Sequence, residues 1–175
     1  MRESVLSVAI VAALPLLAVG QVTDTAEQSK DVVRQHHARL NRGEVKAAVL
    51  DYAEDAMNHG RSVGREGLQR TLDDIYITFP DWRMEIADMV AEGDTVVVRC
   101  RVSGTHLGVG QRPINGGMLV GVKPTGKRFE VSHIHWYRVR NGKIAEHYAN
   151  RDDIGMMRQL GLLPPAASGA ANPVP

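Results

Sequence analysis

The chain has 175 residues, which fits one domain, since a domain usually holds about 100–200 residues. Hydrophobic residues make up 43% and charged residues 23%, so the composition excludes a disordered or fibrous chain. The 21 basic and 20 acidic residues leave a net charge of +1, and no basic run indicates binding to nucleic acid or to an anionic membrane. A single cysteine, Cys100, excludes an internal disulfide and a cysteine-built zinc site.

The first twenty residues differ from the rest of the chain. Residues 4–20 carry no charge and are somewhat short for a membrane-spanning helix. Ala18-Val19-Gly20 fits the small-x-small pattern of a signal-peptidase site. This pattern predicts a signal peptide over residues 1–20 and a secreted or periplasmic protein without stable membrane insertion. Because Glu3 offsets Arg2 at the start of this leader, an apolar extension on a cytoplasmic protein is the alternative.

Helical spacing of apolar residues marks the next part of the chain. It predicts helices over residues 25–41, 44–54 and 65–78. Gly43 closes the first of them, and Phe79-Pro80 ends the third. Between the second and third helices, we expect a loop over residues 55–60.

From Trp82 onward the apolar period changes to two, which indicates β-strands. We expect strands over residues 82–86, 95–103, 118–122, 129–139 and 143–150, with the glycine-rich stretch 107–127 forming a loop around the short strand 118–122. Asn141-Gly142 predicts a tight hairpin between the last two strands. A short helix over residues 152–160 and a disordered tail over residues 165–175 complete the chain.

Helices followed by a strand meander predict an α+β fold. Three N-terminal helices would pack on one face of a strongly curved antiparallel or mixed sheet. Such an arrangement leaves a cone with an internal pocket, which is a natural site for a small molecule. We expect this domain to span residues 21–164.

A series of short motifs follows along residues 26–164: Asn58-His59-Gly60, Phe79-Pro80-Asp81, Glu92-Gly93-Asp94-Thr95-Val96, Gly104-Thr105-His106, Pro124-Thr125-Gly126-Lys127, Asn141-Gly142-Lys143-Ile144, Glu146-His147 and Arg158-Gln159-Leu160-Gly161. Together and in this order they resemble the SnoaL-like polyketide and ester cyclases of the nuclear-transport-factor-like superfamily. Characterised members of that family include enzymes that close a ring in aromatic polyketide esters by intramolecular aldol chemistry. They work without a metal or an organic cofactor. The resemblance therefore implies a cofactor-independent cyclase or isomerase for a small polyketide-like carbonyl or ester substrate.

One position departs from the family. In the polyketide cyclases, an aspartate that moves the proton stands two residues after the histidine of the last strand, where this chain has His147 and then Ala149. His135 matches a family histidine, and His133 stands where the family carries glutamine or a similar polar residue. Two alternatives stay open. The missing proton-moving group argues for a non-catalytic small-molecule-binding or protein-interaction module, and the other alternative is an ester or epoxide hydrolase built on the same fold.

The last two strands carry the candidate catalytic side chains. Alternate residues of a strand face opposite sides, so His133, His135 and Tyr137 share a face. A two-residue turn would bring His135 opposite Tyr148, but a shift of one residue would turn His147 to the other face. Because the resemblance places the histidines of both strands inside, we expect His133, His135 and His147 to point into the cone.

These side chains suggest acid–base chemistry. A neutral imidazole suits removal of a proton from the carbon between two carbonyl groups, so His147 or His135 is the expected base. Arg99, with His133, would stabilise the negative charge that develops. The other expected substrate-binding residues are Asn58 and His59 at the rim, Arg101, Tyr137, Asp152 and Asp153.

Several other polar residues are expected to have structural roles. One of the two aspartates is expected to cap the last helix, and the other to orient a histidine or to pair with an arginine. His36 and His37 are neighbours in a helix and are expected to be structural. We expect no metal, because no carboxylate shares the spacing of the histidines and the resemblance implies none. On the convex face of the sheet, Ile134 and Trp136 would be exposed in a monomer, which predicts a homodimer through that face.

Overall fold

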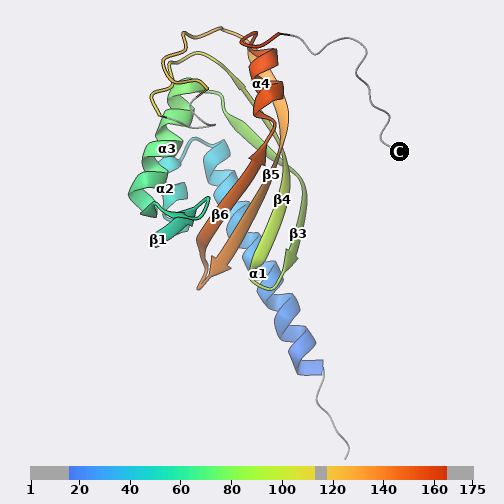
Figure 1. Cartoon of the computed structure of the whole chain (residues 1–175). Helices are drawn as coiled ribbons and strands as arrows, with labels where there is room; N and C mark the ends of the chain where they lie inside the picture. The colour runs from blue at the N-terminus through green and yellow to red at the C-terminus, as the bar shows by residue number, and fades with distance from the viewer. Residues whose placement is uncertain (1–15, 113–117, 165–175) are drawn as a thin grey trace, which may run out of the picture.

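Helices α1 and α3 lie against one face of a curved six-stranded sheet (Figure 1). The computed structural model describes residues 16–112 and 118–164. Its elements in chain order are α1 (Leu16–Asn41), α2 (Val45–Val49), β1 (Tyr52–Asn58), β2 (Arg61–Ser62), α3 (Gly64–Thr78), β3 (Arg83–Glu92), β4 (Thr95–Thr105), β5 (Arg128–Arg140), β6 (Lys143–Arg151) and α4 (Asp153–Gln159).

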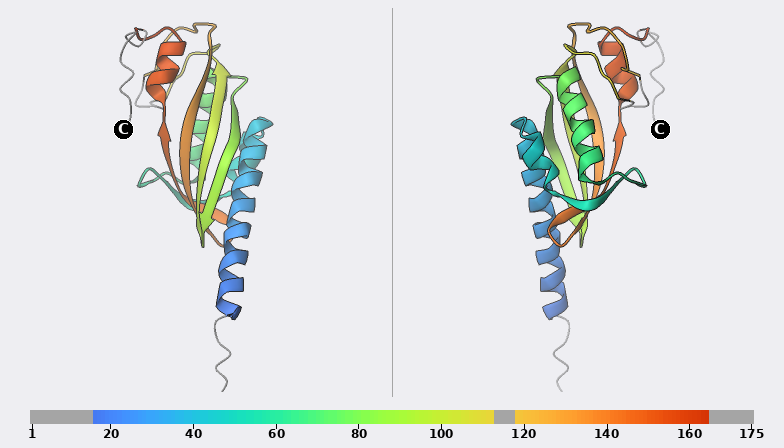
Figure 2. Two further views of the ribbon diagram at one scale, coloured as in Figure 1. Left: turned by 90° about the vertical axis from the view of Figure 1, so that its right-hand side faces the viewer. Right: turned by 90° about the vertical axis from the view of Figure 1, so that its left-hand side faces the viewer.

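The strand order is β2-β1-β6-β5-β4-β3, and the sheet is not closed. Neighbouring strands are antiparallel except β1 and β6, which run parallel. Figure 2 shows α1 extending past the end of the sheet, while α4 covers the opposite end. The predicted α+β fold, with helices packed on a curved mixed sheet, is confirmed.

The core lies between the inner face of the sheet and the helices. Along β4, Val96, Val98, Cys100 and Val102 are at most 1% exposed, because alternate residues of the strand turn inward. Burial of a side chain of this kind stabilises the fold by about 1.5–3 kcal/mol. Burial also raises the pKa of Cys100 to about 12, so this residue is a buried thiol, as expected.

Local signals located most helices and strands correctly. Helix α1 covers the predicted helix 25–41 and begins earlier, at Leu16. It ends before Gly43, which adopts a φ of +71° and donates its N–H to the carbonyl of Leu40 at 2.7 Å. Helices α3 and α4 also match the prediction. The outer parts of the expected leader and the expected tail, residues 1–15 and 165–175, lie outside the described residues.

The second predicted helix was wrong in its second half. Helix α2 ends at Val49, and residues 52–58, which were expected to form the end of that helix and most of the following loop, form strand β1. Strand β1 pairs in parallel with β6. Its backbone hydrogen-bonding partners therefore lie far away in the sequence, where a local pattern cannot indicate them. The predicted strand 118–122 was also wrong, because its described residues form only an isolated bridge between Gly110 and Val120.

The hairpin between β5 and β6 has an irregular register. Its turn is the expected one, because Asn141 and Gly142 adopt φ angles of 50° and 69° and Arg140 pairs with Lys143. Two residues further along, Ala145 is inserted as a β-bulge, which shifts the pairing by one residue. His135 therefore lies opposite Ala149, and the predicted pairing of His135 with Tyr148 is wrong.

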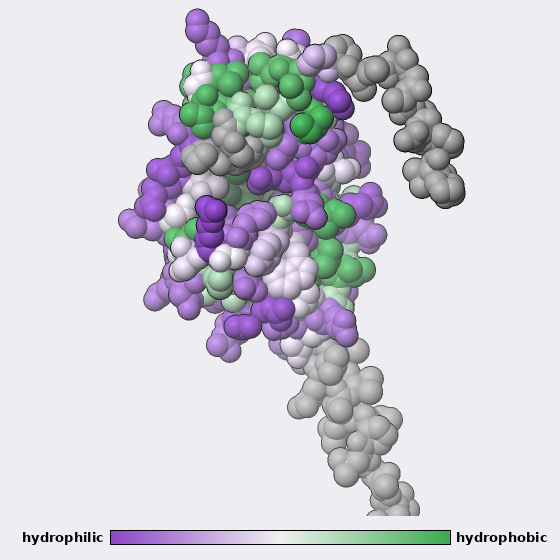
Figure 3. Space-filling view, viewed as in Figure 1, coloured by the Kyte–Doolittle hydropathy of each residue, from purple (hydrophilic) through white to green (hydrophobic). Residues whose placement is uncertain are grey.

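The face of the molecule that is turned to the viewer in Figures 1 and 3 is largely hydrophilic, and its apolar side chains gather at the top, over α4 and the adjoining loop (Figure 3). Within the described part of the chain, no helix combines the length and the apolar character that are needed to cross a membrane.

Candidate active site

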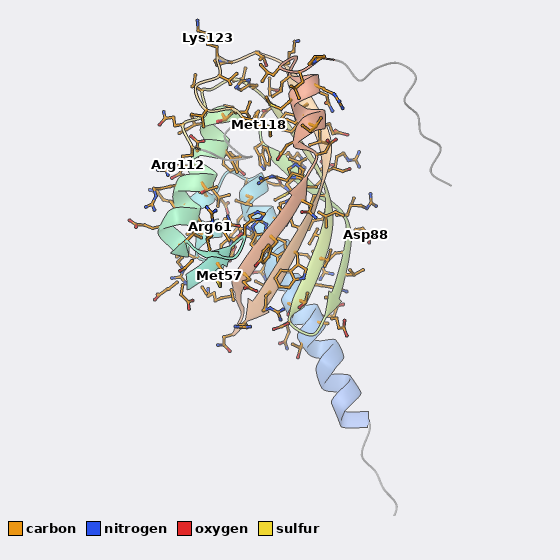
Figure 4. All side chains as sticks on the ribbon, viewed as in Figure 1. Met57, Arg61, Asp88, Arg112, Met118 and Lys123 are labelled. Atoms are coloured by element: carbon orange, nitrogen blue, oxygen red, sulfur yellow. The ribbon has the colours of Figure 1, made fainter. Side chains whose placement is uncertain are left out.

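A cavity of about 110 Å³ lies between the inner face of the sheet and helices α1 and α3. Its apolar wall comes mainly from α3 and the start of β3: Leu68, Leu72, Ile75, Phe79, Trp82 and Met84. Its polar wall consists of His36, Tyr52, Asn58, His59, Thr71, Asp74, Thr78, Arg112, His133, His135, Tyr137, His147 and Arg151. Figure 4 shows Arg112 beside α3, and Met57 and Arg61 on the hairpin of β1 and β2. An apolar wall facing a few polar groups is typical of a small-molecule site.

The bulge at Ala145 turns His147 into this cavity. In a regular two-residue hairpin, His147 would face away from His135, because one step along a strand reverses the direction of the side chain. The extra residue restores the match, so Tyr137 lies opposite His147. The expectation that His133, His135 and His147 point inward is confirmed, and all three line the cavity.

A chain of hydrogen bonds joins Asn58, His147 and His135. His147 Nδ1 is 2.9 Å from Asn58 Oδ1, and His135 Nδ1 is 2.9 Å from His147 Nε2. With the carbonyl oxygen of Asn58 facing His147, Nδ1 of His147 donates and its Nε2 accepts. His135 then donates through Nδ1, which leaves its Nε2 as an unprotonated, buried atom without a hydrogen-bond partner in the described structure.

Burial keeps these imidazoles neutral near pH 7. It lowers the pKa of His133 to about 4, with the charge of Arg151 acting in the same direction. It also holds the pKa values of His135 and His147 well below the usual range, and neighbouring imidazoles add to this effect. Neutral histidines with a free lone pair can accept a proton from a substrate.

Arg151 supplies positive charge to the cavity. It lies opposite His133 on β6, and its charge lowers the pKa values of His133, His135 and His147. Its guanidinium Nε is 3.5 Å from Asp153 Oδ2. The sequence analysis missed Arg151, although its position two residues after Ala149 places it on the same face of the strand.

The predicted arginines of β4 lie elsewhere. Arg99 and Arg101 are exposed on the outer face of the sheet, because Val98, Cys100 and Val102 occupy the inner face. Arg101 lies 3.9–4.0 Å from the carboxylates of Glu130 and Glu85 on the same outer face. The expectation that Arg99 and Arg101 face the pocket is therefore wrong.

The other expected binding residues divide into two groups. Asn58, His59 and Tyr137 line the cavity, as predicted. Asp152 and Asp153 do not, contrary to the prediction, because they lie at the start of α4 and are used there. Asp152 Oδ1 accepts the N–H of Gly155 at 2.8 Å and caps the helix, while Asp153 pairs with Arg151, so both structural expectations are confirmed.

Two adjacent histidines of α1 also reach this region. His36 lines the cavity, with Nε2 3.3 Å from the hydroxyl of Tyr52. His37 Nε2 is 2.9 Å from the hydroxyl of Tyr137, one of the cavity residues. Both histidines are 1% exposed. Sequence analysis had given His36 only a structural role, because nothing in a helix pattern shows that Tyr52 lies beside it.

The described residues contain no group of three or more histidine, cysteine or acidic side chains arranged to hold a metal ion. His106, another fully buried histidine, lies outside the cavity, where its Nδ1 accepts the backbone N–H of Thr125 at 3.3 Å.

Comparison with known proteins agrees with this fold and site. The profile of the SnoaL-like polyketide cyclases matches residues 30–160. Nogalonic acid methyl ester cyclase of Streptomyces nogalater is 30% identical over 113 residues, which are 63% of this chain and 78% of the relative. Aklanonic acid methyl ester cyclase DnrD of Streptomyces peucetius is 47% identical over 45 residues, which are 26% of this chain and 31% of that protein.

Solved structures give the same result. IdmH of Streptomyces antibioticus, a suggested polyketide cyclase, is 30% identical with a TM-score of 0.62, covering 77% of this chain and 99% of that one. TsrD of Streptomyces laurentii is 26% identical with a TM-score of 0.66, covering 78% of this chain and 97% of that one. Since the family profile spans well over half of its residues, the chain belongs to the SnoaL-like polyketide cyclases, a family of cyclase-type enzymes.

Proposed function

We propose that the protein closes a ring in a small polyketide-like carbonyl or ester substrate by intramolecular aldol chemistry, with Nε2 of His135 as the base. The observation that supports this most strongly is the hydrogen-bonded chain from Asn58 through His147 to His135, because it presents an unprotonated nitrogen to the cavity. Ala149, which takes the place that the resemblance assigns to an aspartate, lies opposite His135. In this proposal His135 takes over the work of the missing carboxylate.

The reaction begins with the removal of a proton from the carbon between two carbonyl groups. His135 Nε2 takes this proton, while His135 Nδ1–H continues to donate to His147. The negative charge moves to the carbonyl oxygens, where Arg151 and His133 stabilise the enolate. The enolate carbon then attacks a second carbonyl of the same molecule and closes the ring. The apolar wall from α3 holds the substrate folded for this attack.

The test measures proton exchange, the first step of the reaction, without requiring ring closure. A 1,3-ketoester is incubated in heavy water, and deuterium incorporation at the carbon between the carbonyls is followed by NMR with the unchanged protein, His135→Ala and His147→Ala. We expect His135→Ala to lower the rate about 100-fold or more. His106→Ala serves as the control, because it removes another buried imidazole outside the cavity. Unchanged exchange in His135→Ala would overturn the proposal.

A second candidate, a binding module without turnover, is favoured by Ala149 in the cavity wall. It predicts saturable binding of the ketoester with neither exchange nor ring closure. Incorporation of labelled oxygen from water into an ester substrate would instead identify a hydrolase.

We propose that the protein forms a homodimer through the outer face of the sheet. Ile134 and Tyr148 are 48% and 38% exposed, and both lie on the outer face, because Ile134 pairs with Arg99 and Tyr148 pairs with Trp136. Ile134→Glu should convert the dimer to a monomer in light scattering, and Ile154→Glu on α4 is the matched control. A monomer in the unchanged protein would contradict this proposal.

We also propose that the protein is exported and cleaved after Gly20. The charge-free stretch 4–20 and the small residues before Gln21 support cleavage there. This bond lies within helix α1, upstream of Val33 and Leu40, which anchor the helix in the core. The intact mass of the protein from its natural source should correspond to residues 21–175, and a full-length mass would refute export by this route.

A further inference from the structure

A second chain of buried polar groups reaches the cavity from α1 and β1. It consists of Tyr52, His36 and Asp51. The hydroxyl of Tyr52 is 3.3 Å from His36 Nε2, and His36 Nδ1 is 3.4 Å from Asp51 Oδ2. Tyr52 and His36 both line the cavity, and both are at most 3% exposed. The mechanism above does not use any of these three groups.

The surroundings of His36 define how its protons are placed. Its Nδ1 is 3.2 Å from the carbonyl oxygen of Ala48, which can only accept, so Nδ1 carries a hydrogen. The carboxylate of Asp51 lies on the same side of the ring. An imidazole between a carboxylate and a hydroxyl can hold a second proton on Nε2, because the anion offsets the positive charge.

Asp51 is ionised in this arrangement. Burial by itself would raise its pKa, but the nearby ring of His36 and the hydrogen bond from Arg39 outweigh burial and hold the pKa below the usual range. Burial, with the charge of Asp51, raises the pKa of Tyr52 above its usual range, so the hydroxyl keeps its proton until a strongly basic oxygen lies beside it.

The two chains therefore present different groups to the cavity, one a proton acceptor and the other a proton donor. The chain of Asn58, His147 and His135 contains no carboxylate and ends in a free lone pair. The chain of Asp51, His36 and Tyr52 contains a carboxylate and ends in a hydroxyl. An aldol ring closure needs one group of each kind, since a carbon loses a proton and an oxygen gains one.

We propose that Tyr52, supported by a doubly protonated His36 and by the carboxylate of Asp51, is the acid that protonates the carbonyl oxygen attacked during ring closure. This inference rests on the proposed cyclase function and adds its second catalytic residue. As the new carbon–carbon bond forms, the electron pair of the attacked C=O moves to its oxygen. That oxygen takes the hydroxyl proton of Tyr52, and Tyr52 takes the Nε2 proton of His36. His36 becomes neutral, Asp51 remains a carboxylate, and the product is a ring alcohol.

The experiment uses a 1,3-ketoester that carries a tethered ketone, so that deuterium exchange and ring closure are measured on one compound. Exchange requires the base alone, whereas closure requires both groups. We expect Tyr52→Phe to exchange deuterium within about threefold of the unchanged protein and to close the ring about 100-fold more slowly. Asp51→Asn should also slow closure more than exchange, because an amide no longer stabilises a proton on His36. The matched control is Tyr76→Phe, because Tyr76 does not line the cavity and its hydroxyl donates to the backbone carbonyl of Leu40.

The possible outcomes distinguish a role of Tyr52 as the acid from a failure of the proposed base and from a purely structural role of Tyr52. If Tyr52→Phe closes the ring at the normal rate, the proposal is wrong. It is equally wrong if exchange and closure fall by the same factor, because that result indicates a disturbed cavity. Thermal unfolding of each variant identifies a loss of fold. If the unchanged protein does not exchange deuterium at all, the proposed base fails, and with it the reaction that Tyr52 would serve.

Discussion

His135 and His147 lie on neighbouring strands with their rings nearly parallel, at an interplanar angle of 19° and a centroid distance of 5.2 Å. Their facing nitrogens are 2.9 Å apart. One imidazole therefore sets the tautomer of the other, and Asn58 sets the tautomer of His147. The reactivity of the buried nitrogen of His135 thus depends on a side chain that it does not touch.

Asn58→Asp should strengthen the base. A carboxylate at this position accepts the Nδ1–H of His147 and stabilises positive charge on the two imidazoles, so it raises the pKa values that burial has lowered. The acid side of the profile of deuterium exchange against pH should then move to higher pH. Asn58→Ala should instead slow exchange by about tenfold without this shift. An unmoved profile in Asn58→Asp would show that Asn58 does not act through His147.

Ala149→Asp should restore activity to a protein that lacks its base. Ala149 lies opposite His135 and lines the cavity, so an aspartate there has access to the same substrate carbon. In the His135→Ala background, we expect Ala149→Asp to raise deuterium exchange at least about tenfold. Ala149→Asn provides an uncharged side chain of the same size. Equal rates in the two double variants would mean that the carboxylate cannot reach the carbon.

Arg151 and Arg99 form a matched pair of substitutions. Arg151→Gln should slow exchange about 100-fold, because it removes the positive charge that faces the enolate. Arg151→Lys should retain part of the rate and keep a partner for Asp153. Arg99→Gln should have no effect, since Arg99 lies on the outer face. Comparable losses in Arg151→Gln and Arg99→Gln would contradict the assignment of the cavity charge.

The buried histidines should make the protein sensitive to acid. The pKa of His133 is about 4 in the folded protein, compared with the usual histidine pKa of 6.5. The unfolded chain therefore binds more protons between these values, and the stability contributed by neutral His133 is full above pH 6.5 and lost as the pH falls toward 4. At pH 5 the loss from His133 is about 2 kcal/mol. Urea unfolding at pH 7 and pH 5 should show a smaller difference for His133→Gln than for the unchanged protein, and His59→Gln at the exposed rim is the control.

The parts that the sequence predicted well are those specified by neighbours in the chain. Helix α3 has its own apolar stripe, and the β5–β6 turn has Asn141-Gly142. Strand β1 was missed because its pairing partner, β6, lies far away in the sequence, and the spacing of its apolar residues also fits a helix. Local pattern gives a weak preference, which tertiary pairing can override.

The site divides in the same way. The inward direction of His133 and His135 follows from alternation along one strand, but the direction of His147 also depends on the bulge. The expectation that Arg99 faces the pocket was wrong, because alternation alone does not show which face of strand β4 is the inner one. The chain of Asp51, His36 and Tyr52 could not be predicted, since it requires the docking of α1 against β1.

The extra residue at Ala145 has a consequence for protein engineering. Deleting it leaves Glu146 opposite Arg138 and His147 opposite Tyr137, because the deletion removes only the residue that has no partner. A one-residue insertion between Glu146 and His147 instead turns His147 to the outer face of the sheet and exposes it to solvent. A deletion of the bulge residue in this strand is therefore tolerated, whereas an insertion beyond the bulge is damaging.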